Sequence, residues 1–208
     1  MRTHRLSLLL LCCLLLAALM TPATAIAQRR PRAEINITSL KGESVRSPDF
    51  KASKDSPKDF WGQFVVKFDL KSAGNKDGWL DQLEVVWKVL ATDREGKARL
   101  LALETVYEDI EEGTARKACI YLKPKFMRRF MGSGGRFSPG SYSIYCEMRI
   151  DGQRVASYDS TIAKHKPFGR WYTKDSDRER GQRYLIPKNR SPFAVIDYDS
   201  YECEKAAE

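Results

Sequence analysis

Histidine is the scarcest of the common catalytic residue types in this chain. The 208 residues include two histidines, and only His165 lies beyond residue 27. Histidine-dependent catalytic triads and zinc sites built from several histidines would therefore rest on one residue. The signatures G-x-S-x-G, S-x-x-K, C-x-x-C and H-E-x-x-H are also absent. These absences indicate a protein that is not an enzyme, with no cofactor and no metal site.

Cysteine is sparse as well. Two of the five cysteines, Cys12 and Cys13, lie in the first apolar run, which leaves Cys119, Cys146 and Cys203. Three thiols allow at most one intrachain disulfide, so the apolar core must hold the fold together. We expect free thiols rather than a Cys119–Cys146 bond, with Cys146 facing the core, because unpaired cysteine often behaves as a small apolar residue.

Long apolar runs are absent except for one near the start, Leu6–Met20. Arg2 and Arg5 precede this run, and small residues that offer two cleavage frames follow it up to Ala27. A basic start, a short apolar run and a cleavage site of small residues are typical of an export signal peptide, here residues 1–27. The run is also shorter than the ~20 residues that a membrane-spanning helix needs.

The alternative for this segment is a retained anchor helix, because Arg29, Arg30 and Arg32 follow closely and would act as a stop signal. We prefer cleavage, which places the protein outside the cytoplasm: in the periplasm, on the outer surface or secreted. That location excludes nucleotide chemistry and nucleic-acid partners. It also leaves no membrane span in the exported chain.

The exported chain is basic. Arg2 and Arg5 lie in the signal peptide, so 34 lysines and arginines remain against 27 acids, a net charge of +7. An exported basic protein meets acidic glycans and other anionic envelope polymers more often than it meets nucleic acid. The alternative is that the charge serves only solubility.

Apolar and polar residues alternate with period two along most of the chain, which indicates half-buried strands. Turn-forming groups such as Asp93–Gly96 and Asp151–Gly152 separate these stretches. One short helix is predicted over Lys123–Phe130, where Pro124 suits a first helical turn. The predicted strands are Ile35–Leu40, Phe64–Leu70, Leu83–Leu90, Leu100–Tyr107, Ala118–Leu122, Tyr142–Ile150 and Val155–Ile162.

Seven short strands without a long helix indicate an all-β fold, an immunoglobulin-like sandwich of two antiparallel sheets. Trp87 lies in the third strand, where such folds place a core tryptophan, and Tyr142 opens the sixth strand like a corner tyrosine. The predicted organisation is a signal peptide (1–27), an N-terminal arm with the first strand (28–59), the sandwich (60–163) and an extended C-terminal tail (164–208).

The C-terminal tail divides by charge. Residues 164–190 hold nine lysines and arginines against three acids, whereas residues 191–208 hold five acids against one lysine. The segment Phe193–Tyr198 is apolar and β-prone, and a strand of this kind is costly to leave unpaired. We predict that it adds a strand to its own sheet or to that of a second copy, self-pairing being preferred. The strand residues concerned are Phe193, Val195, Ile196 and Tyr198.

Two stretches, Lys123–Phe130 and Lys164–Tyr172, combine basic and aromatic residues. Guanidinium groups bind sulfate, phosphate and carboxylate, while exposed aromatic faces stack on sugars. The alternative interpretation, which we prefer, is that the aromatic residues of both stretches cap the ends of the sandwich and the charges point outward. The candidate binding residues for an acidic glycan or other anionic ligand are Arg128, Arg129, Lys166, Arg170 and Trp171.

Three parts of the chain carry a resemblance to a known family: Trp79–Asp81 leading to Val85–Trp87, the strand pair around Tyr142 and Ile150, and Leu185–Lys188 continuing through Ser191–Ala194. The chain resembles the exported immunoglobulin-like proteins encoded in the type IV pilus-like gene cluster of verrucomicrobial gut bacteria. The similarity extends over residues 33–200. It implies a cell-surface or pilus-associated protein with a sandwich like that of archaeal pilins.

The first apolar run departs from that family pattern. A pilin retains its apolar helix and usually carries an early glutamate in it, whereas Leu6–Met20 contains none and precedes a cleavage site that would discard it. The resemblance therefore fits an accessory or secreted partner better than a shaft subunit.

These observations predict an exported, non-enzymatic binding or assembly protein with a pilus-associated or surface-attachment role. Its partner would be an envelope or pilus protein, or an acidic glycan, and the tail offers a route to a homo-oligomer. The alternative is a secreted or periplasmic enzyme that acts on cell-wall or mucin polysaccharide. A deep pocket with convergent carboxylates would favour the enzyme, and shallow grooves would favour binding.

We predict cleavage after Ala25 or Ala27 during export. Each of these alanines completes a small-x-small cleavage motif that follows the apolar run. Intact-mass spectrometry of the protein from its native host should show a chain that begins at Ile26 or Gln28. A mass that includes Met1 and the apolar run would contradict the cleavage and, with it, the argument for export.

Overall fold

The computed structural model describes residues 33–48, 60–72, 77–132, 137–174 and 183–205. All of them lie in one compact unit, Pro31–Glu208. The predicted signal peptide with its cleavage site, and the part of the N-terminal arm between residues 49 and 59, fall outside the described residues.

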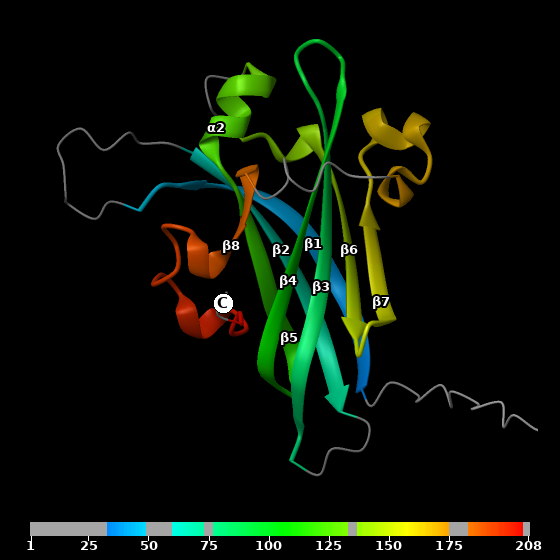
Figure 1. The fold of residues 1–208 in the computed structure, drawn as a ribbon, viewed down its shortest axis with the longest axis vertical. Helices are drawn as coiled ribbons and strands as arrows, with labels where there is room; N and C mark the ends of the chain where they lie inside the picture. The colour runs from blue at the N-terminus through cyan, green and yellow to red at the C-terminus, as the bar shows by residue number, and fades with distance from the viewer. Residues whose placement is uncertain (1–32, 49–59, 73–76, 133–136, 175–182, 206–208) are drawn as a thin grey trace, which may run out of the picture. The chain divides into compact units, whose positions relative to one another are not determined.

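The described strands form two antiparallel sheets of four strands each (Figure 1). The first sheet has the order β1-β2-β5-β8, with bounds Ala33–Arg46, Phe60–Ser72, Gly113–Leu122 and Leu185–Pro187. The second has the order β4-β3-β6-β7, with bounds Ala98–Glu111, Trp79–Thr92, Tyr142–Ile150 and Gln153–Ser160. The predicted immunoglobulin-like sandwich is confirmed, with eight strands instead of seven.

Most strands are longer than the alternating stretches that predicted them. Pairing of β1 with β2, for example, runs from Ala33 opposite Ser72 to Arg46 opposite Phe60. Backbone hydrogen bonds do not depend on side-chain polarity, so a ladder continues into polar segments where alternation no longer marks it.

The predicted short helix is present as α2 (Pro124–Phe126), which continues into a π-helical turn, η1 (Met127–Met131). The described chain also contains short 3₁₀ pieces: η2 (Pro139–Ser141), η3 (Ala163–Phe168), η4 (Trp171–Thr173), η5 (Lys188–Arg190) and η6 (Tyr198–Ser200). Within the described residues, none of the helices has the length and hydropathy to cross a bilayer.

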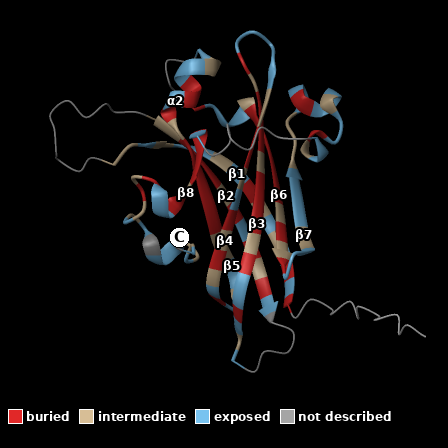
Figure 2. Cartoon of the chain, in the orientation of Figure 1, coloured by how far each residue is buried: buried red, intermediate tan, exposed pale blue. Residues whose placement is uncertain are grey.

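The core lies between the sheets, where the apolar members of the alternating strands meet (Figure 2). Trp87 in β3 is completely buried, and its ring nitrogen donates a hydrogen bond to Thr105 Oγ1 at 3.0 Å. The Tyr107 hydroxyl in β4 donates to the Cys119 carbonyl in β5 at 3.3 Å, so a hydrogen bond joins the two sheets. The core position predicted for Trp87 is confirmed.

The three cysteines of the described chain are unpaired, as expected. Cys146 is buried in the core between the sheets, whereas Cys119 faces the other side of β5 and packs beside Tyr121. Burial raises the pKa of the Cys119 thiol to about 12 and also raises the pKa of the Cys146 thiol. Both thiols are therefore protonated and inert at neutral pH, and Cys203 is the exposed one.

Tyr142 begins β6 at the predicted corner position, and its role there is packing. Its ring stacks on Phe137 with centroids 4.6 Å apart and meets Phe64 of the other sheet at 6.1 Å. Its buried hydroxyl has no hydrogen-bond partner among the described residues. The corner hydrogen bond typical of antibody domains is therefore not made within that part of the chain.

The tail adds a strand to the first sheet, but not the predicted one. Strand β8 pairs with β5, whereas Phe193–Tyr198 forms turns. The amide of Ala194 donates to the Ser191 carbonyl at 3.2 Å, and the chain turns again at Asp197, whose φ is 48°. The prediction of a strand through Phe193, Val195, Ile196 and Tyr198 is therefore wrong.

Side-chain packing explains why this segment does not need strand pairing. Phe193 is buried, stacks on Tyr121 of β5 with centroids 4.5 Å apart, and meets Trp61 edge-on at 5.8 Å. Ile196 packs against the same cluster, while Val195 stays 72% exposed. Phe193 and Ile196 thus cover one face of the first sheet instead of extending its edge.

The last described residues, 201–205, form a strap that joins the two sheets. Backbone hydrogen bonds of 3.0 and 2.8 Å tie Cys203 and Lys205 to the edge of β4. On the other side, the amide of Glu202 donates to the Lys117 carbonyl in β5 at 2.9 Å. Within this chain the tail therefore contacts both sheets, through residues other than those predicted.

Glu204 fastens this strap to the earlier part of the tail. Its carboxylate accepts hydrogen bonds from the backbone amides of Lys188 at 2.9 Å and Asn189 at 2.7 Å. It also lies 3.5 Å from the Tyr107 hydroxyl. Burial raises the pKa of the Glu204 carboxyl.

We predict that Glu204→Ala lowers the free energy of unfolding by about 2 kcal/mol, because two backbone amides lose their charged acceptor. Thermal unfolding of the exported chain should show a melting temperature lower by about 5 °C. Glu34→Ala, at an exposed position of β1, serves as the control and should change stability by less than about 0.5 kcal/mol. An unchanged melting temperature for Glu204→Ala would contradict the role of the strap.

Candidate functional site

Three segments that are far apart in sequence meet at one end of the sandwich (Figure 1). They are the β3–β4 turn (93–97), the α2–η1 segment with the residue before it (123–131), and the η3–η4 segment (163–174). Strands β3 and β7 are both antiparallel to β6, so they end on the same side, and α2 follows β5. We call the surface that these three segments form the basic end.

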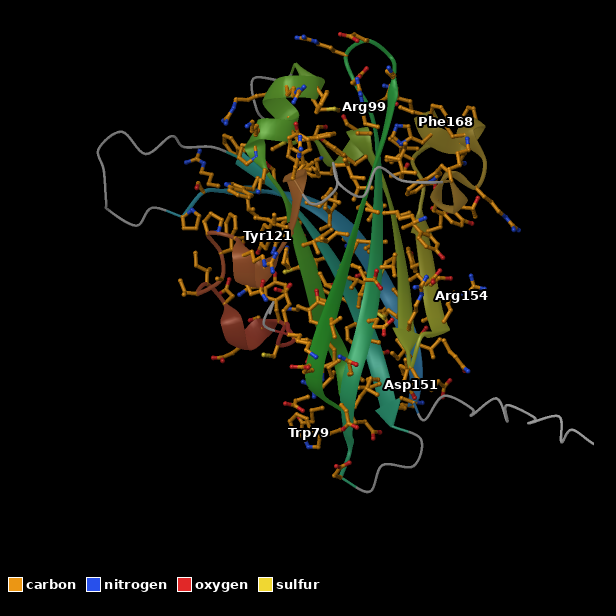
Figure 3. All side chains as sticks on the ribbon, in the orientation of Figure 1. Trp79, Arg99, Tyr121, Asp151, Arg154 and Phe168 are labelled. Atoms are coloured by element: carbon orange, nitrogen blue, oxygen red, sulfur yellow. The ribbon has the colours of Figure 1, made fainter. Side chains whose placement is uncertain are left out.

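Direct contacts join two of the segments of the basic end. The amide of Arg94 in the β3–β4 turn donates to the Phe130 carbonyl in η1 at 3.0 Å. The Arg99 guanidinium lies over the Phe130 ring, 4.8 Å from its centroid. Figure 3 labels Arg99, at the β3–β4 hairpin, and Phe168 at this end of the sandwich. The basic end is therefore a structured surface, built from loops whose positions the sheets fix.

The charge of the basic end is strongly positive. Its acids are Asp93 and Glu95, and its ten basic residues are Arg94, Lys97, Lys123, Lys125, Arg128, Arg129, Lys164, Lys166, Arg170 and Lys174. Asp93 is already engaged, because Arg99 Nε donates to it at 2.8 Å. Burial alone would raise the Asp93 pKa, but hydrogen bonds from the Lys97 amide and the Arg99 side chain hold that pKa below its usual value.

Four of the five predicted binding residues lie at this end as exposed cations. They are Arg128, Arg129, Lys166 and Arg170. The Arg129 guanidinium donates to the Tyr184 hydroxyl at 3.1 Å and lies over a neighbouring phenylalanine ring at 5.1 Å. Such contacts hold a cation in place, which lowers the entropy cost of binding an anion.

Trp171 is the exception among the predicted binding residues. It is 1% exposed, packs with Leu90 and Tyr145, and donates its ring N–H to Thr161 Oγ1 at 2.8 Å. A buried ring face cannot stack on a sugar, so the prediction of Trp171 as a binding residue is wrong. The alternative interpretation, in which such aromatic residues cap the sandwich and the charges point outward, is confirmed for Trp171.

His165 has a structural role that the sequence did not indicate. Its buried ring places Nδ1 2.8 Å from Ser143 Oγ and Nε2 2.9 Å from Thr92 Oγ1. Ser143 is completely buried and also accepts the Ile162 amide at 3.0 Å. The Ser143–His165 spacing suits a nucleophile and its base, but the burial keeps any polymer away. The pair instead anchors η3 to the second sheet.

An open groove of about 350 Å³ lies between the edges of β4 and β8. Glu104 and Glu204 both line it, but the two oxygens of Glu204 already accept backbone amides. Paired-carboxylate catalysis needs both carboxyl groups to act on the substrate, so this groove does not support the enzyme alternative. In the part of the chain that the structure describes, no three histidine, cysteine or acidic side chains gather to hold a metal ion.

A protein-family model matches residues 26–208, nearly the whole chain. The chain belongs to that family. Among solved structures, a protein from Akkermansia muciniphila is similar over 86% of this chain and 96% of its own, with 22% identity and a TM-score of 0.71. At that identity the likeness shows the fold alone, and its source agrees with the resemblance to verrucomicrobial proteins. No curated protein matches the chain.

We predict that the protein loses stability as the pH falls from about 7.5 to about 5.5. Burial, with a smaller contribution from the positive Lys164, lowers the His165 pKa in the folded state, whereas the unfolded chain keeps a pKa of about 6.5. The buried His165 ring resists protonation in the folded state. Its contribution to the free energy of unfolding is therefore complete above about pH 6.5 and is lost as the pH falls below that value. Thermal melts at the two pH values measure the loss.

His165→Gln provides the control for this pH dependence. The variant removes the only histidine beyond residue 27, so its melting temperature should change less over the same interval, although the protein is less stable at the higher pH. The same pH dependence in both proteins would show that His165 is not its source.

Proposed function

We propose that this is an exported, non-enzymatic protein of the cell surface that binds an anionic partner through its basic end, in a pilus-associated or surface-attachment role. The observation that carries the proposal is the presence of ten basic residues and two acids in the three segments that meet there. Loops that a rigid scaffold holds in place commonly carry binding function, and this scaffold is a packed sandwich.

The exposed side chains define the chemistry of the partner. Guanidinium and ammonium groups bind carboxylate, sulfate and phosphate through charge-assisted hydrogen bonds. Burial of Trp171 removes one aromatic face from the surface, so recognition depends on charge more than on ring stacking. An acidic glycan or an acidic face of an envelope or pilus protein has the required chemistry. Attraction of this kind is long-ranged and sensitive to salt.

The layout of residues 1–27 supports export to the periplasm, the outer surface or the medium. The family match begins at Ile26, directly after one of the two predicted cleavage positions.

We predict that Arg128→Glu combined with Arg170→Glu weakens binding of the exported chain to a soluble polyanion such as dextran sulfate. The loss should be about tenfold at roughly 0.1 M salt, because an attraction becomes a repulsion in each of two segments. Fluorescence anisotropy with a labelled polyanion measures the affinity.

Lys41→Glu combined with Lys67→Glu is the matched control, with the same change in net charge at exposed positions of β1 and β2. This control should lose less than about threefold in affinity, since only the long-range field changes. Equal losses in the two variants would show that binding follows net charge rather than the basic end, and the proposal would fall.

A further inference from the structure

Three acidic segments lie at the opposite end of the sandwich. They are residues 77–81 at the start of β3, 108–113 where β4 leads into β5, and 151–152 in the β6–β7 turn. These three segments contain no lysine or arginine. The exposed acids of this surface, which we call the acidic end, are Asp77, Asp81, Asp109, Glu111, Glu112 and Asp151.

Neighbouring cations offset part of this charge, and Lys71 of β2 is exposed at the same end. Arg116 of β5 pairs with Glu111 at 3.0 Å, and Lys205 of the strap pairs with Glu108 at 3.4 Å. The Glu111 side chain keeps 58% of its surface exposed in that pair. Exposed pairs of this kind are weak, so a second cation can still approach the carboxylate.

An exposed tryptophan lies within the acidic end. Trp79 is 41% exposed and pairs directly with Glu111 across β3 and β4. Figure 3 labels Trp79 and Asp151 at the end of the sandwich opposite Arg99 and Phe168. Tryptophan is enriched at the centre of protein interfaces, and its ring face attracts guanidinium groups.

We propose that the anionic partner of the basic end is the acidic end of a second copy, so that copies join head to tail. The inference rests on the proposed function, because it uses the same basic end and names its partner. The two surfaces are complementary in charge, and two copies of the same end repel each other. Trp79 adds partly exposed apolar surface beside the carboxylates of the acidic end.

The placement of the two surfaces determines the kind of assembly. They lie at opposite ends of one molecule, and they differ, so the contact is heterologous and leaves one free end of each kind on every dimer. Repetition of the contact produces a linear array rather than a closed pair. Because the attraction is electrostatic, the array should form at low ionic strength and separate when salt screens the charges.

Sedimentation velocity of the exported chain tests this assembly. At low salt the wild-type protein should show species that grow with concentration, and about 0.5 M NaCl should return it to monomer. Arg128→Glu with Arg170→Glu disables the basic end, and Asp81→Lys with Glu112→Lys disables the acidic end. Each double variant alone should associate at least about tenfold more weakly than the wild type.

Mixing the two double variants gives the decisive measurement. The intact acidic end of the first fits the intact basic end of the second, so an equimolar mixture should form a 1:1 dimer and nothing larger. That dimer also shows that both variants are folded. The control Lys41→Glu with Lys67→Glu should assemble like the wild type.

Several results would overturn the head-to-tail contact: a monomeric wild type at low salt, association that persists in either double variant, or a mixture without a dimer. A monomeric wild type that still binds dextran sulfate through Arg128 and Arg170 would leave the proposed function in place with an acidic glycan as the partner. If those two arginines also have no effect on polyanion binding, both the contact and the proposed function fall.

Discussion

Phe64 of one sheet meets Tyr142 of the other with ring centroids 6.1 Å apart, and contacts of this kind hold the two sheets together without a covalent bond. Each fully buried apolar side chain in such a core contributes about 1.5–3 kcal/mol. Because the core fixes the strands, every loop leaves a sheet at a set position. The meeting of three basic segments at one end is therefore a consequence of how the sheets pack.

The fold separates the residues that hold it from the residues that can bind. Trp87 and Cys146 lie between the sheets, whereas Arg128 and Arg170 lie on loops beyond the strand ends. Phe130 connects the two groups, since its ring packs against the core and lies beneath the Arg99 guanidinium. Surface lysines and arginines can thus be substituted without altering the core, while contacts with neighbouring side chains hold a few of them in position.

The sequence predicted the sandwich well, because alternation in strands such as Tyr142–Ile150 reflects burial that each strand carries in its own residues. It did not predict β8, which has three residues and exists only because the edge of β5 is available. Phe193 looked like a strand residue, yet its apolar ring is satisfied by stacking on Tyr121. For Trp171 the sequence left a surface role and a capping role open, because nothing local shows which tertiary contacts cover the ring. In each of these cases, contacts with residues far away in the sequence determined the local structure or the burial of the side chain.

The strap has a consequence for the order in which the chain folds. Tyr201 bonds to Gln63, which is 138 residues earlier, and Glu204 reaches Tyr107 across 97 residues. The hairpins β3–β4 and β6–β7 close over short loops, so they can form before these distant contacts. During synthesis residues 201–205 also emerge after the strands that they join. The strap therefore forms late in folding. A chain that ends before residue 201 already contains β1 to β7, and residues 201–205 then join the two sheets.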